Sequence, residues 1–390
     1  MKTKDYSDLI EYNTISHSPN VAAMDLGTNS CRLLISSVDI TSLHRNFFKG
    51  KQEPRQLRVI DSFAKIVGLG EGIKQTGLLS LEAIERTIDA LYACKKKIDH
   101  YHISEFRAVA TEACRQAKNS KILIDAARND VGIELEVISP REEARLVLKG
   151  CSGVISEKKE YGILLDIGGG STEVVWLKRD KNSTSKAISV IDSVSLPYGI
   201  VTLSDTYTHN GADPSVFSRA QQNISQTVQF FMVKNRIKDL LQKNMVQVVT
   251  SSGTVTTIGS LALGLKSYHR NSVDGKDFHS DKISYIGRGI LSRYLRSSLT
   301  NILSGCEKGF ISKKIDHPYA REGNQLLYYR MGLLSSGIVI INSVLETIGD
   351  CTIRIADRGV REGVLFDLIE RIRNHQSVSW NMRNTATKSL

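Results

Sequence analysis

The stretch "ILLDIGGGSTEVVW" (163–176) places three consecutive glycines and two hydroxyl residues between two apolar runs. Apolar runs on either side of a turn predict two buried strands joined as a hairpin. Successive glycines let backbone N–H groups come close together with no Cβ in the way, which suits phosphate oxygens. Asp166 and Glu173 flank the turn, and carboxylates beside a phosphate cradle are what Mg²⁺ or Mn²⁺ requires. Taken alone, three glycines are better explained as a hairpin that needs glycine only for its turn, and the two flanking carboxylates favour the phosphate site.

A second copy of this pattern occurs earlier, in "VAAMDLGTNSCRLLISSV" (21–38). Asp25 is followed by a glycine and by hydroxyl residues, as Asp166 is 141 residues later. That spacing is about the length of one domain. The repeat favours an active-site role for Asp25 over the simpler role of capping a turn.

The remaining periodicity predicts two α/β lobes, each opened by an aspartate-bearing hairpin. Ser80 is an expected N-cap for a helix over 80–99, whose apolar face would be formed by Leu81, Ile84, Ile88, Leu91 and Ile98. Further expected elements are strands over 105–111, 133–139 and 246–253 and a helix over 120–130. A polar loop is expected over 267–283 and a frayed end from about 374.

The segment "VISPREEARLVLKG" (137–150) carries an acidic pair at the start of a predicted helix. Ser139, Pro140 and Glu142 fit the N-cap, N1 and N3 positions of a capping box. Glu143 has no capping task and points about a hundred degrees further round the helix, so it is free to face a cleft. The alternative is that Glu143 only complements the helix dipole.

Two further segments could bind phosphate. "TSSGTVTT" (250–257) places Ser252, Gly253 and Thr254 between a strand and a helix, where N–H groups at the helix start could receive an anion, although a plain helix cap explains them equally. Arg115 and Arg32 are basic residues near the other motifs, and either could be a solvated surface charge.

Composition bounds the class of protein. The chain has 390 residues, 41% of them hydrophobic, enough for two or three cores. Lysine and arginine number 52 against 41 acidic residues, and the net charge of +11 favours a polyanionic partner. The six cysteines lack C-x-x-C spacing, so neither a zinc site nor a disulfide framework is predicted. We find no signal-peptide pattern and no run near the roughly 20 apolar residues that span a bilayer, and therefore expect a cytoplasmic protein.

In combination these segments resemble the exopolyphosphatase and guanosine pentaphosphate phosphohydrolase (Ppx/GppA) family of the actin, sugar-kinase and heat-shock-chaperone superfamily. The resemblance covers about residues 20–366. The matching segments, in the order of the family, are "DLGTNSCRLLI" (25–35), "ATEACRQAKN" (110–119), "VISPREEARL" (137–146), "LLDIGGGSTEVV" (164–175), "SLPYGIVTL" (195–203), "SSGT" (251–254) and "DRGVREGVL" (357–365).

The resemblance implies an α/β fold of two ribonuclease-H-like lobes, over 20–143 and 144–366, with the active site in the cleft between them. A flexible extension would occupy 1–19, and a tail over 367–390 could pack back on the first lobe. Pro140 and Thr28 depart from the common glycine and serine of the family, but both suit their positions. The additional C-terminal HD-type domain of longer members is expected to be missing, which puts a long-chain grip in doubt.

The resemblance also implies roles for individual residues. Glu143 would be the catalytic glutamate. Asp166, Glu173 and Asp25 would lie at a centre that binds Mg²⁺ (or Mn²⁺). The implied phosphate ligands are Gly168, Gly169, Gly170, Ser171 and Thr172 of the glycine loop, Arg115, and Asn29, Ser30 and Arg32 of the first hairpin, to which the helix start adds Ser252, Gly253 and Thr254.

The expected activity is hydrolysis of the terminal phosphoanhydride of inorganic polyphosphate, releasing phosphate. A guanosine pentaphosphate (pppGpp) phosphohydrolase is the alternative, and a regulator that binds the guanosine alarmone without turnover is a further one. A sugar or acetate kinase of the same superfamily is disfavoured by the acidic pair at 142 and 143. Neither nucleic acid nor membrane is an expected partner, and the oligomeric state is left open, a homodimer included.

Overall fold

The computed structural model describes residues 19–38, 58–180, 187–303 and 324–386, and it contains two β-sheets. The strand order of the five-stranded sheet recurs in the six-stranded sheet, read from its opposite end, and the larger sheet has one further strand at its edge. The first sheet has the order β3-β2-β1-β4-β5 and consists of β1 (Asn20–Leu26), β2 (Ser30–Ser37), β3 (Arg58–Ile66), β4 (Ile103–Ala110) and β5 (Leu135–Val137). The second has the order β10-β11-β9-β6-β7-β8 and consists of β6 (Tyr161–Ile167), β7 (Thr172–Arg179), β8 (Ile188–Leu196), β9 (Val246–Ser251), β10 (Asp277–His279) and β11 (Thr352–Ala356).

In each sheet the first strand of an antiparallel hairpin also pairs, on its other side, with a parallel strand. β1 pairs antiparallel with β2 and parallel with β4, and β6 pairs antiparallel with β7 and parallel with β9. The repetition of strand order confirms the predicted α/β fold of two ribonuclease-H-like lobes. It also brings the glycine loop and its earlier counterpart to the carboxyl ends of β6 and β1, where open α/β sheets bind their ligands.

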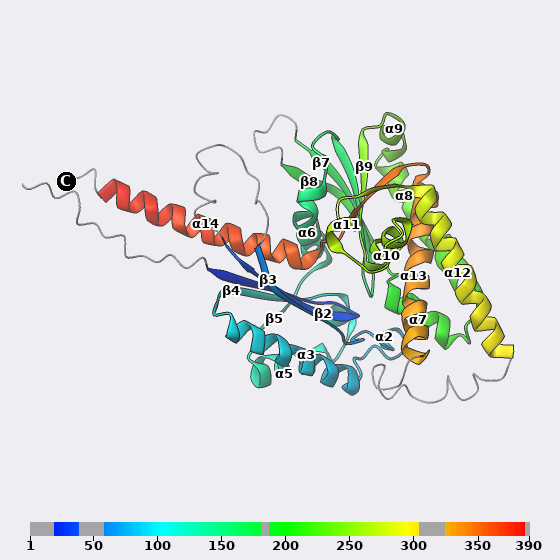
Figure 1. The fold of residues 1–390 in the computed structure, drawn as a ribbon, viewed down its shortest axis with the longest axis horizontal. Coiled ribbons are helices and arrows are strands. Elements are labelled where there is room, and N and C mark those ends of the chain that lie inside the picture. The colour runs from blue at the N-terminus through cyan, green and yellow to red at the C-terminus, as the bar shows by residue number, and fades with distance from the viewer. Residues whose placement is uncertain (1–18, 39–57, 181–186, 304–323, 387–390) are drawn as a thin grey trace, which may run out of the picture.

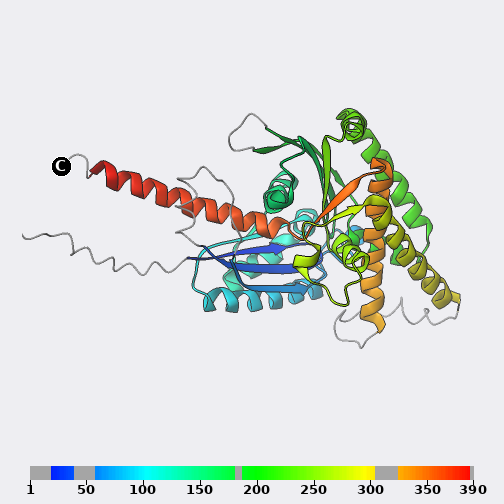
Figure 2. The same ribbon diagram turned by 45° about the horizontal axis from the view of Figure 1, so that its top comes forward.

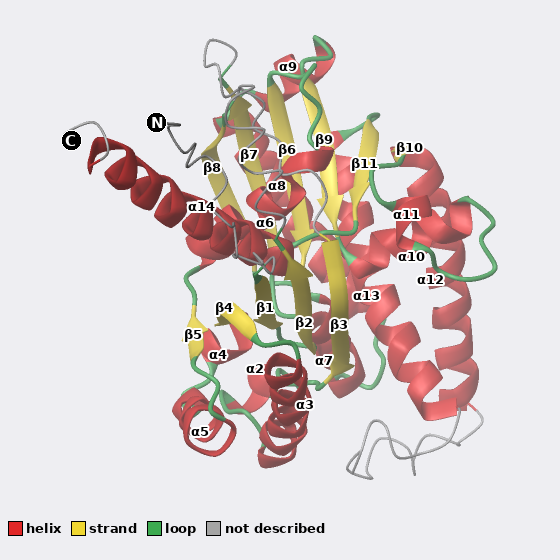
Figure 3. Cartoon of the chain, turned by 60° about the vertical axis from the view of Figure 1, so that its left-hand side comes forward, coloured by secondary structure: helices red, strands yellow, loops and turns green. Residues whose placement is uncertain are grey.

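Helices cover the outer face of each sheet (Figures 1 and 3). The first lobe contains α2 (Ile73–Thr76), α3 (Leu81–His100), α4 (Glu112–Gln116), α5 (Ser120–Ala126) and a π-helical turn, η1 (Ala127–Val131). The second contains η2 (Ser152–Val154), α7 (Ile200–His209), α8 (Ser215–Lys234), α9 (Ile237–Gln242), α10 (Gly253–Ala262), α11 (Arg270–Val273), α12 (Ser280–Leu303) and α13 (Asn324–Ile348). Each set buries an apolar core against its own sheet.

Two more helices, α6 (Pro140–Cys151) and α14 (Val360–Ala386), lie in the space between the two sheets, as Figure 2 shows. They follow the last strand of the first lobe and β11 of the second, and α14 packs back on β1, β2 and β4. A shared core joins Val21 and Leu34 of the first sheet, Leu164 and Val249 of the second, and buried residues of both helices. The predicted boundary between residues 143 and 144 therefore falls inside α6, because the helix that starts at the cleft continues as the layer between the lobes.

Caps and hydrophobic periodicity in the sequence predicted most of the helices and strands correctly. Ser80 accepts a hydrogen bond from the Ala83 N–H at the start of α3, and Ser139 accepts one from the Glu142 N–H at the start of α6. Leu81 was wrongly assigned to the apolar face of α3, since its side chain is 66% exposed. It sits in the first turn, beyond the edge of the core that the later turns cover.

Two expectations about less regular segments were wrong. The predicted loop over 267–283 contains α11 and the edge strand β10, held in place by the buried Val273 and Phe278. The predicted frayed end is helical as far as Ala386, and residues 367–386 contain no glycine or proline to end the helix. The 19-residue stretch Arg330–Ile348 of α13 is long and apolar enough to cross a membrane by composition, but most of it is buried in the second lobe, as in a core helix. The predicted extension over 1–19 lies, apart from its last residue, outside the described residues.

Candidate active site

The two repeated hairpins have the same backbone geometry. Asp25 pairs across its hairpin with Arg32, and Asp166 pairs with Glu173, each partner seven positions further on. The Gly27 N–H donates to the Ser30 carbonyl at 3.0 Å, and the equivalent bond from Gly168 to Ser171 also measures 3.0 Å. The repeat recognised in the sequence is therefore a structural repeat, with the loop over 27–30 in one lobe and the loop over 168–171 in the other.

A cavity of about 370 Å³ lies between the lobes where these loops meet. Most of the predicted site residues line it: Asp25, Asn29, Ser30, Arg32, Glu143, Asp166, Gly168, Gly169, Gly170, Ser171, Ser252 and Gly253. These residues come from four separate segments of the chain, so the fold assembles in one place what the sequence keeps far apart.

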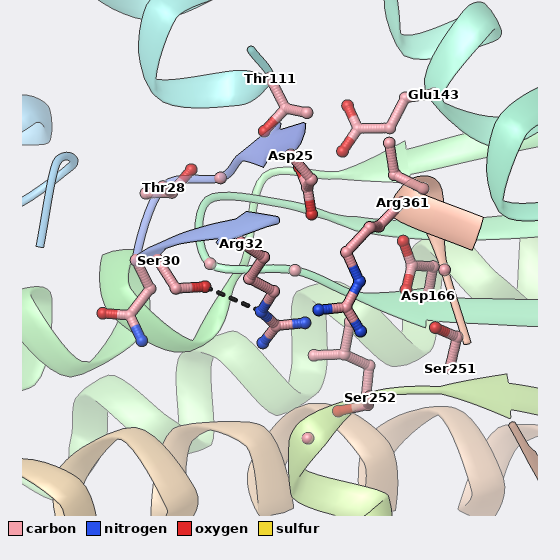
Figure 4. A pocket seen from close by; sticks show the side chains of 18 of the residues that line it. Asp25, Thr28, Ser30, Arg32, Thr111, Glu143, Asp166, Ser251, Ser252 and Arg361 are labelled. Atoms are coloured by element: carbon pink, nitrogen blue, oxygen red, sulfur yellow. Dashed lines mark hydrogen bonds between the residues drawn. The ribbon is translucent and has the colours of Figure 1, made fainter. Parts of the chain in front are cut away.

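Acidic and basic side chains face one another inside the cavity (Figure 4). Asp25, Glu143 and Asp166 project into it, as do the guanidinium groups of Arg32 and Arg361. Burial raises the pKa of Asp25, while the two arginines oppose that rise. Burial and the nearby Glu143 raise the pKa of Asp166 to about 7. The positive charge of the two arginines therefore does not fully offset the burial and mutual repulsion of the cavity carboxylates, and their pKa values stay raised.

Glu143 lies in the first turn of α6, only 8% exposed. Burial and the neighbouring Glu173 carboxylate raise its pKa to about 8, against the opposing effect of Arg115. A carboxylate with a pKa near the working pH is a better proton acceptor than an ordinary surface glutamate. The adjacent Glu142 does not reach back to the helix start as a capping box would, because Arg107 and Arg145 bind its carboxylate.

Arg115 is placed behind Glu143 and does not line the cavity. Its Nη1 donates to Glu143 Oε2 and to the Ile138 carbonyl, both at 2.8 Å, and its Nε and Nη2 donate to Glu112 Oε2. The residue predicted as a phosphate ligand therefore addresses the predicted catalytic carboxylate instead. Four of the five N–H groups of this guanidinium are thereby used within the protein, two on Glu112, one on Glu143 and one on the Ile138 carbonyl.

Glu173 is also set back from the cavity, next to Asp166 on the neighbouring strand. Its Oε1 accepts from Ser171 Oγ at 2.6 Å and from Ser195 Oγ at 3.1 Å, while its buried Oε2 has no hydrogen-bond partner. Burial and Asp166 raise the pKa of Glu173 to about 7. An unpartnered buried carboxylate oxygen is costly, which indicates that a cation or proton satisfies it.

Two predicted phosphate ligands turn away from the cavity. Thr172 is fully buried, and its hydroxyl donates to the Tyr198 carbonyl at 2.7 Å. Thr254 packs against Gly337 of α13, so closely that a Cβ on that glycine would lie 2.0 Å from the Thr254 hydroxyl. Both side chains serve packing in the second lobe, because residues next to each other on a strand or at a helix start point in different directions.

Two structural features explain why the glycine loop has no side chains. Within the described chain, the N–H groups of Gly169 and Gly170 donate to no other group, so they are available to an anion. A Cβ on Gly169 would lie 2.8 Å from the Thr28 Cβ, and one on Gly170 would lie 2.8 Å from the Thr28 hydroxyl. The glycines thus let the loops of the two lobes touch, a requirement that the sequence did not reveal.

The oxygen donors of the cavity suit Mg²⁺ only in a binding mode that uses few protein ligands. Among the described residues, no three or more Asp, Glu, His or Cys side chains converge as a complete ligand set. The oxygen donors available are the carboxylates of Asp25 and Asp166, with Glu173 behind them. Mg²⁺ commonly binds through one or two carboxylates, keeping waters and substrate phosphates as its other ligands, and this donor set suits that mode.

The segment over 357–362 contributes residues to the cavity for which the sequence suggested no role. Arg361 reaches the carboxylates, and its buried Nε has no hydrogen-bond partner. Glu362 accepts from the Gly359 N–H at 2.9 Å and so fixes the start of α14. The available signal was the motif "DRGVREGVL", whose glycines and charges directly follow an apolar strand, but only the fold shows which arginine faces inward.

A sequence model of the Ppx/GppA phosphatase family matches residues 50–288, more than half of the chain. The chain belongs to the Ppx/GppA phosphatase family. Exopolyphosphatase 2 of Mycobacterium tuberculosis is 30% identical over 271 residues, which cover 66% of this chain and 76% of that protein. A bifunctional 3-dehydroquinate synthase/phosphatase of Fusobacterium nucleatum is 26% identical over 354 residues, 90% of this chain and 46% of the other.

Solved structures of the family share the fold. The crystal structure of the Ppx/GppA family member of Aquifex aeolicus superposes with a TM-score of 0.60 at 25% identity, covering 92% of this chain and 98% of the other. An exopolyphosphatase-like protein superposes with a TM-score of 0.67 over 91% of this chain and 99% of the other, and at 23% identity it shows the fold alone. This Ppx/GppA chain therefore has the two-lobed architecture of the family.

Proposed function

We propose that this Ppx/GppA protein is a metal-dependent exopolyphosphatase, which hydrolyses the terminal phosphoanhydride of inorganic polyphosphate and releases phosphate. One observation carries the proposal: the buried carboxylate of Glu143 shares a cavity with the free N–H groups of the glycine loop and with the arginines at positions 32 and 361. A base beside a cluster of anion-binding groups is the equipment that attack of water on a phosphoryl group requires.

Each group has a distinct task in the proposed reaction. The terminal phosphoryl oxygens accept hydrogen bonds from Gly169 and Gly170, and Arg32 and Arg361 offset the negative charge. Glu143 takes a proton from water as the water oxygen bonds to the terminal phosphorus. The bond between the terminal phosphorus and the bridging oxygen breaks. The bridging oxygen leaves with the shortened chain, and the terminal phosphoryl group, now bonded to the water oxygen, is released as inorganic phosphate. Water supplies all the atoms added, so no other co-reactant is needed.

The metal is part of the proposal, and its residues are Asp25 and Asp166, supported by Glu173. When bound, Mg²⁺ or Mn²⁺ would neutralise charge on the phosphoryl oxygens. Ser195 and Ser171 hold one oxygen of Glu173 in place and leave the other free. Arg115 keeps the Glu143 carboxylate directed at the cavity. These contacts orient the acidic groups before any substrate arrives.

Polyphosphate is favoured over pppGpp as the substrate. The cavity lining, as far as the structure describes it, contains arginines but no aromatic side chain on which a guanine base could stack. The net charge of +11 suits a long polyanion. The relative from Mycobacterium tuberculosis is named an exopolyphosphatase. A pppGpp phosphohydrolase remains the alternative, since its terminal phosphoanhydride is chemically the same.

The test is phosphate release from polyphosphate and from pppGpp, each with and without Mg²⁺, by the native protein, Glu143→Gln and Glu134→Gln. Glu134 is an exposed glutamate paired with Arg128 and serves as the matched control. We expect polyphosphate to be the better substrate, Glu143→Gln to lose about 10²–10⁴-fold in kcat, and Glu134→Gln to keep native activity. Full activity of Glu143→Gln would refute its role as the base.

Two other outcomes would favour a different function. Tight pppGpp binding without phosphate release under any metal would indicate an alarmone-binding regulator. Transfer of phosphate from ATP to a small acceptor would indicate a kinase.

A further inference from the structure

Beside the cavity, two contacts join the lobes through residues that do not line it. The Gly72 N–H, just before α2 in the first lobe, donates to Asp205 Oδ2 of α7 in the second lobe at 3.1 Å. Lys74 Nζ donates to the Pro197 carbonyl at 3.2 Å and lies 5.4 Å from the centre of the Tyr198 ring. We refer to Gly72, Lys74, Pro197 and Asp205 as the interlobe latch.

The first-lobe half of the latch is tied to the first phosphate loop. The N–H groups of Val67 and Gly68 donate to the Asn29 carbonyl at 2.8 and 3.0 Å. The Gly70 N–H donates to the Thr28 carbonyl at 2.8 Å. The segment that ends at Gly72 is therefore bonded along the loop over 27–30, and the two move together.

The second-lobe half is tied to the glycine loop in the same manner. At the start of α7, the Ile200 N–H donates to the Gly168 carbonyl at 3.0 Å and the Val201 N–H to the Gly169 carbonyl at 2.9 Å. Asp205 lies on this same helix. A displacement of α7 relative to the first lobe must then displace the glycine loop relative to the loop over 27–30.

The Asp205 carboxylate is poorly explained by stabilisation of its own lobe. Burial raises its pKa to about 6, so the charge is costly where it lies, and Gly72 and Lys74, both from the other lobe, oppose that cost. Its favourable partners exist only when the lobes are together. The residue thus favours the arrangement in which both phosphate loops surround the same cavity.

We propose that Asp205 is a positioning residue, which latches α7 to Gly72 so that the two phosphate loops are brought together around the substrate. This inference rests on the proposed function, because it assigns the loops to phosphate. Without the latch, closure of the cleft must be driven by substrate binding, and the apparent affinity falls by the fraction of molecules already closed.

The test compares Asp205→Ala, Asp205→Asn and the control Asp239→Ala, an exposed aspartate on α9. Asparagine keeps a carbonyl oxygen that can accept from Gly72, whereas alanine has no acceptor. For polyphosphate with Mg²⁺ we expect Asp205→Ala to raise KM about tenfold, the size expected for a lost hydrogen bond to a charged acceptor, with kcat changed less than about twofold. Asp205→Asn and Asp239→Ala should stay within about threefold of the native KM.

Backbone hydrogen exchange over residues 67–77, without substrate, gives a readout independent of activity. Faster exchange in Asp205→Ala, and native exchange in Asp205→Asn, supports the latch even if the native protein hydrolyses neither substrate, in which case only the proposed function fails. Native exchange and native KM in Asp205→Ala, or a fall in kcat at constant KM, overturns the proposal. If Asp205→Ala does not fold, Lys74→Met replaces it and must show the same direction of change in KM and exchange.

Discussion

Arg115 Nη1 lies 2.8 Å from Glu143 Oε2, and this ion pair joins α4 of the first lobe to the start of the helix that runs between the lobes. Glu112, three positions before Arg115, binds the other side of the same guanidinium at 2.6 Å. Both side chains of the central pair are largely buried. Glu112 therefore fixes Arg115, and Arg115 in turn fixes the direction of the Glu143 carboxylate, although Arg115 itself does not line the cavity.

Replacing Arg115 should impair catalysis more than substrate binding. For Arg115→Gln we expect kcat on polyphosphate to fall about 10²-fold while KM changes less than about threefold, since Arg115 does not line the cavity. Loss of the cation removes an effect that lowers the pKa of Glu143, so the ascending limb of the pH–kcat profile should move to higher pH. Arg128→Gln, which breaks an exposed ion pair, is the control. A raised KM at constant kcat would restore Arg115 as a phosphate ligand.

Close packing between Gly70 and Thr28 predicts a rescue. A Cβ on Gly70 would lie 2.2 Å from the Thr28 Cγ2, while the other nearest atoms are 3.5 Å away. Thr28 is 2% exposed and its branched side chain cannot rotate freely. Gly70→Ala should therefore lower the free energy of unfolding by about 1–3 kcal/mol.

The matched variant is Thr28→Ser, which removes the Cγ2 and keeps the hydroxyl. The double variant should recover most of the stability lost in Gly70→Ala, as urea unfolding of all four proteins would measure. If the double variant is as unstable as the sum of the two single variants, the contact between these residues is not the cause.

Sequence alone supplied those parts of the fold that depend on neighbours in the chain. The repeated hairpins, the Ser80 and Ser139 caps and the acidic pair were all readable, because strand alternation, caps and turns are set within about ten residues. Resemblance to the family predicted that the glycine loop and Glu143 belong to one site. Their sharing of one cavity follows from the strand order, which the two copies of the hairpin made predictable.

What sequence did not supply depends on contacts across the whole chain. Nothing near Arg115 indicates that its guanidinium is taken up by Glu112 and Glu143, and nothing in "DRGVREGVL" indicates that Arg361 reaches a cavity. Thr172 looked like a ligand because it follows the glycines, but strand alternation turns its side chain into the lobe. The position of α14 between the sheets is likewise decided by packing with β1 and α6, far away in sequence.

The carboxylates in and directly behind the cavity should make stability fall as pH rises through neutrality. The pKa values of Glu143, Asp166 and Glu173 are raised to about 8, 7 and 7, so the folded protein binds more protons than the unfolded chain between about pH 4 and 8. The free energy of unfolding therefore decreases with increasing pH throughout this window and levels off above it. In EDTA, thermal unfolding should show Tm falling from pH 6 to pH 9.

Addition of Mg²⁺ should flatten that profile. A divalent cation binds the ionised carboxylates, so its stabilisation grows as pH rises and opposes the loss. Glu143→Gln removes one of the coupled groups and should reduce the slope in EDTA. A Tm that rises from pH 6 to pH 9 in EDTA, or a Mg²⁺ effect that is the same at both ends, would contradict this account.

The crossing of α6 and α14 predicts that one methyl group can disturb both stability and catalysis. A Cβ on Gly363 of α14 would lie 2.0 Å from the Leu146 carbonyl oxygen of α6, a backbone atom that cannot move aside alone. Gly363→Ala should push the helices apart and lower the free energy of unfolding by about 3 kcal/mol. Glu143 lies in the first turn of α6 and Arg361 in the first turn of α14. We therefore expect kcat to fall at least about tenfold as well.

Gly289→Ala is the matched control for this crossing, since that glycine is also helical, on α12, and a Cβ there would meet no atom within 4 Å. Its methyl group should raise the free energy of unfolding by about 0.5–1 kcal/mol through helix propensity alone and leave kcat unchanged. The two substitutions are chemically identical, so opposite signs in urea unfolding assign the loss at Gly363 to the helix contact. Equal effects of both substitutions would mean that the distance between α6 and α14 does not set the position of Glu143.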